Sequence, residues 1–96
     1  MLVDNERELR YEWWDGDDLV GFIAYRIEPG ARVLIHTEVL PRFEHTGQGS
    51  ELVRAALDDL RERGLYVVPL CPFVAAYIRR HPEYADLVVG DPAVSD

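Results

Sequence analysis

Thr46-Gly47-Gln48-Gly49-Ser50 is a glycine-rich turn between a β-branched segment, residues 32–39, and a segment with helical periodicity. Glycine lets the backbone approach an anion closely, and the free N–H groups at a helix N-terminus point toward that anion. The turn therefore predicts a phosphate-binding cradle at a strand-to-helix junction. A plainer alternative stays open, in which Thr46 or Ser50 only caps the helix.

The turn does not match the two commonest nucleotide-binding motifs. No Gly-Lys-Ser or Gly-Lys-Thr follows it, which excludes a Walker loop, and the third glycine of a dinucleotide-binding fingerprint is absent. A full nucleotide-binding fold would also hardly fit in 96 residues. We expect instead a small, mostly antiparallel sheet that leads into one phosphate-binding helix.

The half of the chain before the turn predicts an antiparallel meander. Residues 6–14 and 18–28 are rich in aromatic and aliphatic side chains, and Asp15-Gly16-Asp17 separates them. Two such runs around an Asp-Gly pair are typical of a β-hairpin. Pro29-Gly30 makes the next turn, and residues 32–39 make a third strand.

After the turn the apolar period becomes that of a helix, with one stripe formed by Leu52, Val53, Ala56, Leu57 and Leu60. Gly64 is a plausible stop for this helix, and residues 65–70 form a short strand. Cys71-Pro72 opens a second helix that runs to about Arg80. The order β-β-β-α-β-α predicts one α+β (mixed α/β) domain over residues 1–96, with a core over about 6–88 and a tail at 89–96.

Composition restricts the class of partner. Eighteen acidic residues against ten basic ones give a net charge of −8, which disfavours nucleic acid and suits either a cationic partner or solubility alone. All the basic residues are arginine, which excludes Schiff-base chemistry on a lysine. The single cysteine suits a reducing compartment, and no signal-like or bilayer-length apolar run is present, so we expect a cytoplasmic protein without a membrane partner.

Segments on both sides of the turn resemble the GNAT superfamily of N-acetyltransferases. His36–Pro41 followed by Glu44–Val53 is similar to the acetyl-CoA motif of that family, and Val68–Val74 and His81–Tyr84 extend the match. The chain is most similar to the minimal YjdJ-type branch, which lacks the helices usually found after the first strand. The resemblance covers about residues 10–88 and implies a truncated GNAT fold with two main helices.

The resemblance also implies a ligand and a set of contacts. Acetyl-CoA would be the co-substrate, no metal would be needed, and the acceptor would be an amine of a cationic small molecule or of a protein. Backbone groups of Val39 and Leu40 would hold the pantetheine arm, and the turn amides from His45 to Ser50 would hold the pyrophosphate. The second helix would flank the pantetheine or adenine end through Cys71, Pro72, Phe73, Tyr77 and Arg80. We expect a monomer or a weak dimer.

Two positions depart from the family pattern. Glu44 stands where arginine or glutamine is usual, and His45 stands where glycine is frequent. Glu44 and Glu51 bring negative charge to the expected phosphate site, which lowers its affinity for anions unless they point away. A protonated His45 would offset part of that charge.

His36 is the natural general base for acetyl transfer to an amine, because an imidazole titrates near physiological pH. The minimal branch also places a catalytic histidine at this position. Glu38 lies two residues further along the same strand and therefore on the same face, where it orients His36 or serves as a second base. The alternative is a partly buried strand histidine with a structural role only.

Cys71 stands at the start of the second helix, where the helix dipole favours a thiolate. It would then accept the acyl group in a two-step mechanism or assist proton transfer. The alternative is a small buried apolar side chain. A further alternative for the whole chain is an acyl-CoA-binding or sensing module that does not turn over.

Overall fold

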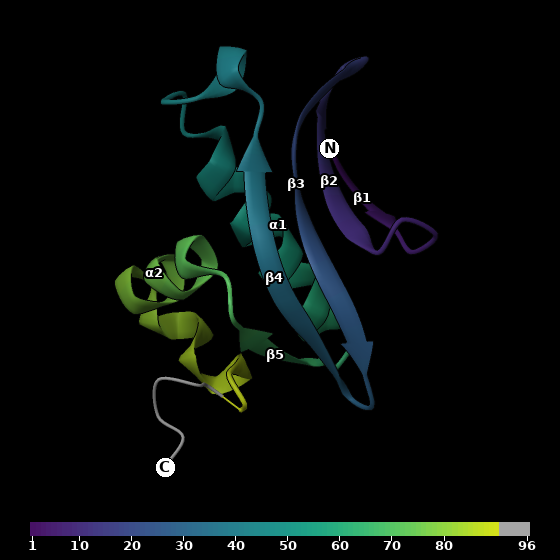
Figure 1. The fold of residues 1–96 in the computed structure, drawn as a ribbon. Helices are drawn as coiled ribbons and strands as arrows, with labels where there is room; N and C mark the ends of the chain where they lie inside the picture. The colour runs from purple at the N-terminus through teal and green to yellow at the C-terminus, as the bar shows by residue number, and fades with distance from the viewer. Residues whose placement is uncertain (91–96) are drawn as a thin grey trace.

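The computed structural model describes residues 1–90, which form one five-stranded sheet with helices against one face (Figure 1). The strands follow the chain order across the sheet; they are β1 (Leu2–Asn5), β2 (Arg10–Asp15), β3 (Asp18–Glu28), β4 (Ala31–Val39) and β5 (Tyr66–Pro69). Neighbours from β1 to β4 are antiparallel, and β5 runs parallel to β4. The helices are η1 (Pro41–Phe43), α1 (Gln48–Glu62), α2 (Pro72–Arg80) and η2 (Pro82–Leu87), of which η1 and η2 are 3₁₀ helices. The predicted α+β class and mostly antiparallel sheet are confirmed.

The N-terminal strand differs from the prediction. Residues 6–14 were expected to form one strand, but residues 6–9 form a turn, and β2 begins at Arg10. Leu9 closes this turn with a φ of 55°, and its N–H donates to Glu6 O at 3.2 Å. The segment before the turn pairs with β2 as an additional strand, β1, with Leu2 opposite Trp13. Aspartate and asparagine occupy half of this short strand and are rare in strands, so its own pattern does not reveal it.

The main core lies between the sheet and the two helices. In the view of Figure 1, α1 runs behind β3 and β4, and α2 lies beside it near β5. The predicted apolar stripe of α1 is confirmed, because all five of its side chains are 0% exposed. They pack with Tyr11, Ile23 and Leu34 of the sheet and with Val74 of α2. No helix of residues 1–90 packs on the other face of the sheet, which is toward the viewer in Figure 1.

A β-bulge in β4 decides which side chains face the helices. Ala24 of β3 pairs with His36, whereas the next residue, Tyr25, pairs with Leu34, so Ile35 is an extra residue in β4. Thr37 therefore shares the helix-facing side with Leu34 and pairs with Ile23, which is fully buried in the core. His36, one residue earlier, points to the opposite, uncovered face.

The ends of the helices follow their predicted signals. Gly64 follows α1 with a φ of 71°, and its N–H donates to Arg61 O at 3.1 Å. Leu65 N–H donates to Leu60 O at 2.9 Å, which completes a Schellman motif. Cys71 is the N-cap of α2 with Pro72 at the first helical position, and the helix ends at Arg80 as expected.

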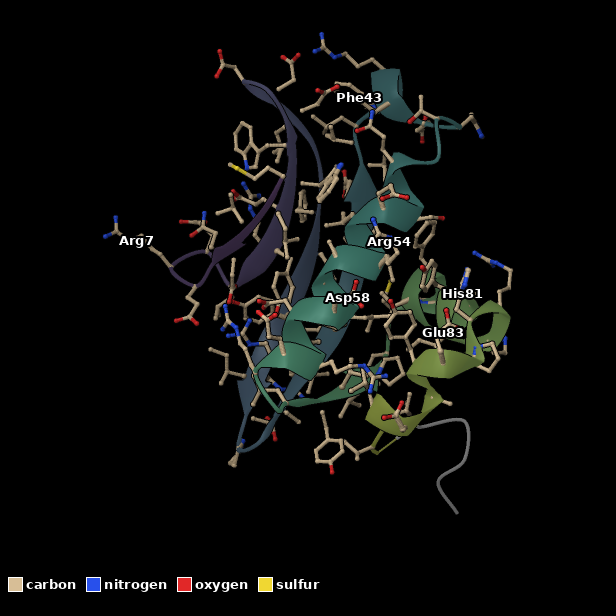
Figure 2. All side chains as sticks on the ribbon, turned by 180° about the vertical axis from the view of Figure 1, so that it is seen from behind. Arg7, Phe43, Arg54, Asp58, His81 and Glu83 are labelled. Carbon is tan, nitrogen blue, oxygen red and sulfur yellow. The ribbon has the colours of Figure 1, made fainter. Side chains whose placement is uncertain are left out.

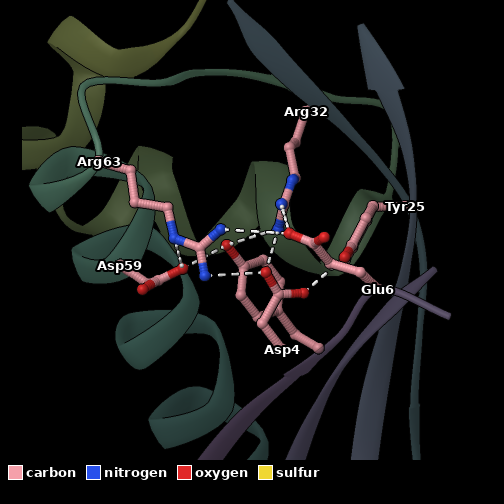
Figure 3. A network of polar contacts seen from close by, with 7 residues as sticks. Asp4, Glu6, Tyr25, Arg32, Asp59 and Arg63 are labelled. Atoms are coloured by element: carbon pink, nitrogen blue, oxygen red, sulfur yellow. Dashed lines mark hydrogen bonds and ion pairs between the residues drawn. The ribbon is translucent and has the colours of Figure 1, made fainter. Parts of the chain in front are cut away.

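A network of polar side chains joins the sheet to the C-terminal end of α1, far from the glycine turn (Figure 3). Arg32 is only 4% exposed, and its guanidinium donates to Asp4 Oδ2 at 2.7 Å and to Tyr11 OH at 3.1 Å. Arg63, the C-cap of α1, also lies 3.0 Å from the Asp4 carboxylate and 3.0 Å from that of Asp59. Burial raises the pKa of Tyr11, and a hydrogen bond to Asp59 adds to the shift. These contacts link β1, β2 and β4 to α1, and each charged side chain in them has an oppositely charged partner.

None of the helices within residues 1–90 has both the length and the apolar character needed to cross a bilayer. Residues 91–96 of the expected C-terminal tail lie outside the described part of the chain.

Candidate active site

The site begins where two parallel strands part. β4 pairs with β5 from Ala31 to Leu34, and the pairing ends at the couple of Leu34 and Pro69. Cys71 N–H then donates to Leu34 O at 2.9 Å, and the chain turns into α2. Residues 35–39 of β4 therefore continue without a strand partner on this side within residues 1–90. Their edge is open to a ligand that contacts backbone groups.

A cavity of about 420 Å³ lies next to this open edge, between β4, the glycine turn and α2. It is lined by Thr37, Val39, Phe43, Glu44, His45, Gly47, Gly49, Ser50 and Phe73. Six of these were predicted from the sequence as cofactor-binding residues: Val39, His45, Gly47, Gly49, Ser50 and Phe73. Phe43 lies beside the N-terminal end of α1, as Figure 2 shows. Thr37 and Phe43 were not predicted, because neither belongs to the glycine turn or to the start of α2.

The glycine turn leaves backbone donors free at the start of α1. Gly47 is the N-cap with a φ of 85°, and His45 also has a positive φ, 63°. Within residues 1–90, neither Gly49 N–H nor Ser50 N–H has a backbone acceptor outside the helix, whereas Glu51 N–H donates to Gly47 O at 3.3 Å. These are the amides that a helix N-terminus offers to an anion.

The capping alternative receives little support. Ser50 does not cap the helix; Thr46 Oγ1 accepts from Gln48 N–H at a long 3.4 Å while its own hydroxyl donates to Phe43 O. Thr46 therefore holds the turn against η1.

Gly49 brings three elements together. A Cβ at this position would lie 3.2 Å from Phe73 Cζ of α2 and 3.2 Å from Val39 Cγ2 of β4. The missing side chain lets the first turn of α1 approach both neighbours closely. The second glycine of the turn thus serves packing, whereas Gly47 serves the left-handed backbone.

Two arginines on the elements around the cavity, Arg42 and Arg54, form ion pairs. Arg42 forms an ion pair with Asp18 at 2.8 Å, and its guanidinium lies 4.8 Å from the centre of the Phe43 ring. Glu51 forms a close ion pair with Arg54 and does not line the cavity. The negative charge of Glu51 is therefore partly neutralised by Arg54 and repels an anion in the cavity less. Glu44 lines the cavity, so its negative charge remains there.

Cys71 lies at the inner end of the region where β4 and β5 part. Its thiol is buried, at 2% exposure, and Sγ lies 3.2 Å from Thr37 Oγ1. Thr37 in turn lines the cavity. The cysteine is therefore both a member of the core and a neighbour, through Thr37, of the cavity. The alternation of side chains after His36 is the one sequence signal that could have drawn attention to Thr37.

His36 and Glu38 form a pair on the uncovered face of the sheet. His36 Nε2 and Glu38 Oε1 are 2.9 Å apart, and the side chains are 61% and 54% exposed. The predicted shared face is confirmed, and the alternative of a partly buried histidine is wrong. The pair and the cavity lie on opposite sides of β4, because Thr37 and Val39 alternate with His36 and Glu38.

The remaining residues of the predicted cofactor site do not line the cavity; they are Leu40, Thr46, Gln48, Pro72, Tyr77 and Arg80. Tyr77 is 3% exposed and stacks on His81, with ring centres 4.1 Å apart. Figure 2 shows His81 beside α2, well away from Phe43. Contacts of these residues with a cofactor stay predictions. Within residues 1–90, no three His, Cys, Asp or Glu side chains are grouped to hold a metal ion.

The comparison with family models identifies one family for this chain, and a solved structure shares its fold. The model of the GCN5-related N-acetyltransferase domain matches residues 10–87. The solution structure of a GCN5-like protein from Staphylococcus aureus superposes with a TM-score of 0.68 at 23% identity. The match covers 94% of this chain and 88% of that one, which shows a shared fold. No curated protein sequence matches the chain significantly.

Proposed function

The chain belongs to the GCN5-related N-acetyltransferase family, an acyltransferase family, and we propose that it transfers an acetyl group from acetyl-CoA to an amine with the residues around β4. The observation that carries this proposal is the cavity between β4, the glycine turn and α2. The free amides of Gly49 and Ser50 lie in its wall, and so does Thr37, whose hydroxyl contacts Cys71.

The residues present fit the binding of acetyl-CoA. Gly49 N–H and Ser50 N–H donate to the pyrophosphate, and the open edge of β4 at Val39 offers backbone groups to the pantetheine arm. Leu40, which the resemblance also implied, has its N–H bonded to Val20 O at 2.8 Å and its carbonyl bonded to Phe43 N–H at 2.9 Å. Phe73 is 41% exposed and offers an apolar wall. When bound, acetyl-CoA supplies the acetyl group as an activated thioester.

Each catalytic residue has one task. His36 accepts the proton that the acceptor amine loses as its nitrogen bonds to the acetyl carbon, and Glu38 orients the imidazole and stabilises its charged form. The C–S bond breaks in the same transfer, and the thiol of Cys71 supplies a proton to the departing sulfur. In the two-step alternative, Cys71 Sγ first takes the acetyl group and then passes it to the amine.

The uncovered face of the sheet is the proposed side of entry for the acceptor. His36 and Glu38 stand there in solvent, and the chain carries a net charge of −8. Both features favour a cationic acceptor, either a small polyamine-like molecule or an amine of a protein. The single cysteine suits a reducing compartment, and we place the reaction in the cytoplasm, carried out by a monomer or weak dimer.

The second candidate function is an acyl-CoA-binding module without turnover. The observation that favours it is the position of His36 and Glu38 on the side of β4 away from the cavity. In that case the cavity alone would matter, and the histidine pair would be a surface feature.

Binding is tested first by thermal unfolding with and without acetyl-CoA. A ligand at 100 times its dissociation constant stabilises the folded state by about 2.7 kcal/mol, which raises the midpoint clearly. An unchanged midpoint at millimolar acetyl-CoA would exclude both candidate functions.

Turnover is tested next, by the release of free coenzyme A with polyamines, basic peptides and aminoglycosides as acceptors. His36→Ala should lower the rate by about 100-fold or more, the usual contribution of a general base. His81→Gln is the matched control, because this histidine lies at the end of α2 and away from the cavity. If His36→Ala, Cys71→Ala and the wild type all release coenzyme A at the same rate, the catalytic roles are wrong. The acyl-CoA-binding module would then be the remaining candidate function. Mass spectrometry of the intact protein for an acetyl group on Cys71 separates the two-step from the direct route.

A further inference from the structure

His45 occupies a position in the cavity wall that its backbone makes unusual. It has a φ of 63°, in the left-handed region that L-residues rarely adopt, although histidine enters it more readily than most. The residue lines the cavity next to the N-terminus of α1. Residues held in sparsely populated backbone conformations cluster at functional sites.

The charges at the cavity leave His45 as the single cationic candidate. Among the described residues that line it, only Glu44 and His45 have ionisable side chains; the others are neutral. On the side of η1, Arg42 is paired with Asp18, and on α1, Arg54 is paired with Glu51. β4 and α2 contribute Thr37, Val39 and Phe73 to the wall, none of which carries charge.

We infer that protonated His45 is the cationic ligand of the pyrophosphate in this protein, so that the affinity of the cofactor site rises as the pH falls. This inference rests on the proposed function and adds a regulation of the same site. A charged imidazole attracts the anion in addition to the free amides, whereas a neutral one does not.

The sign of the effect follows from the charges. Binding of an anion favours the charged form of His45, so binding takes up a proton wherever the free protein holds the neutral form. Affinity therefore increases on lowering the pH through the range in which histidine titrates and then levels off. The carboxylate of Glu44 also lines the cavity, and its negative charge opposes the binding of the anion.

The test is isothermal titration calorimetry with 3′-dephospho-coenzyme A at pH 6, 7 and 8. Its pyrophosphate diester keeps the same charge across this range, so the ligand's phosphates do not contribute a pH dependence. We expect binding to be about five- to tenfold tighter at pH 6 than at pH 8, which is the size of one charge-assisted contact. Titrations at pH 7 in two buffers with different heats of ionisation should show net proton uptake.

His45→Asn is the decisive variant, because asparagine tolerates the left-handed backbone and carries no charge. It should lose the proton uptake and vary less than about twofold between pH 6 and pH 8. His45→Gly should behave in the same way, which guards against misfolding of a single variant. Glu44→Gln should tighten binding at each pH and keep the slope.

Two results would overturn the inference in different ways. If His45→Asn and His45→Gly retain the wild-type pH dependence, the role of His45 is wrong while the proposed cofactor site stands. If the wild type does not bind 3′-dephospho-coenzyme A or acetyl-CoA at any pH, the proposed function fails and this inference fails with it.

Discussion

Thr37 Oγ1 of β4 and Cys71 Sγ at the start of α2 lie 3.2 Å apart, although 34 residues separate them in the chain. The contact lies just beyond the last paired residues of β4 and β5, Leu34 and Pro69. It therefore joins the cavity wall to the buried thiol at the place where the two strands part.

The Thr37 hydroxyl is predicted to control the reactivity of Cys71. Thr37→Val keeps the shape of the side chain but leaves the thiol without its partner, so we expect a loss of about 1 kcal/mol in the free energy of unfolding. In this variant Cys71 should react more slowly with a thiol reagent than it does in the wild type, because its thiolate has lost a hydrogen-bond donor. Thr37→Ser is the matched control and should keep the wild-type rate. Equal rates in the two variants would show that the contact has no effect on the thiol.

The buried Arg32 is predicted to be essential for stability. Arg32→Leu leaves Asp4, itself 10% exposed, without its shortest ion pair, and removal of one partner of a buried pair costs about 3 kcal/mol. Arg26→Ala is the control, because this arginine is 58% exposed, its partner Glu28 is 48% exposed, and such pairs contribute about 0.5 kcal/mol. Urea unfolding of both variants measures the difference. If Arg32→Leu and Arg26→Ala lose similar amounts of unfolding free energy, the buried ion pair of Arg32 and Asp4 is not important for stability.

Substitution of the two turn glycines by alanine is predicted to have different effects: one on acetyl-CoA affinity and the other on stability. Gly49→Ala adds a methyl group that crowds Phe73 and Val39, so we expect acetyl-CoA affinity to fall by about tenfold. Gly47→Ala adds a methyl group with nothing within 4 Å but keeps a φ of 85°, so we expect about 1 kcal/mol less stability. Thermal unfolding and acetyl-CoA titration of both variants separate crowding from strain. The expectation is wrong if Gly49→Ala binds as tightly as the wild type.

Buried tyrosines predict a loss of stability at alkaline pH. Burial, and then a hydrogen bond to Asp58 at 2.6 Å, raise the pKa of Tyr84 from its ordinary value of 10.0 to about 12. Because the folded-state pKa is the higher one, the contribution of Tyr84 is complete below pH 10 and is lost as the pH rises toward 12. Burial also raises the pKa of Tyr11 and of Tyr25, so both add to the loss of stability at alkaline pH. Tyr84→Phe should therefore show a smaller loss between pH 9 and pH 11 in urea unfolding, with Tyr66→Phe, an exposed tyrosine, as the control.

Sequence patterns within one segment of the chain correctly predicted the strand or helix that this segment forms. β3 has the expected bounds, the stripe of α1 is buried, and Gly64 and Cys71-Pro72 mark helix ends. Each of these depends on the residues next to it in the chain. β1 depends on pairing with β2, which no local pattern of four residues reveals.

The site was predicted in part for the same reason. His45, Gly47, Gly49 and Ser50 line the cavity because a strand-to-helix turn is a local structure. A cofactor contact of Tyr77 was implied by the resemblance to the GNAT superfamily and stays a prediction; within the fold Tyr77 packs against His81 and Tyr84, which follow after α2. The burial of a helix face depends on such distant partners.

The bulge at Ile35 has a consequence for the comparison of related sequences. The extra residue reverses the alternation of side chains along β4. Before the bulge the even-numbered Leu34 points to the helices, and after it the odd-numbered Thr37 and Val39 do so. An alignment gap of one residue between Leu34 and Thr37 would exchange the side chains that face the cavity for those that face solvent. Two relatives could then keep the same motif letters and the same fold while presenting different chemistry to the acyl group.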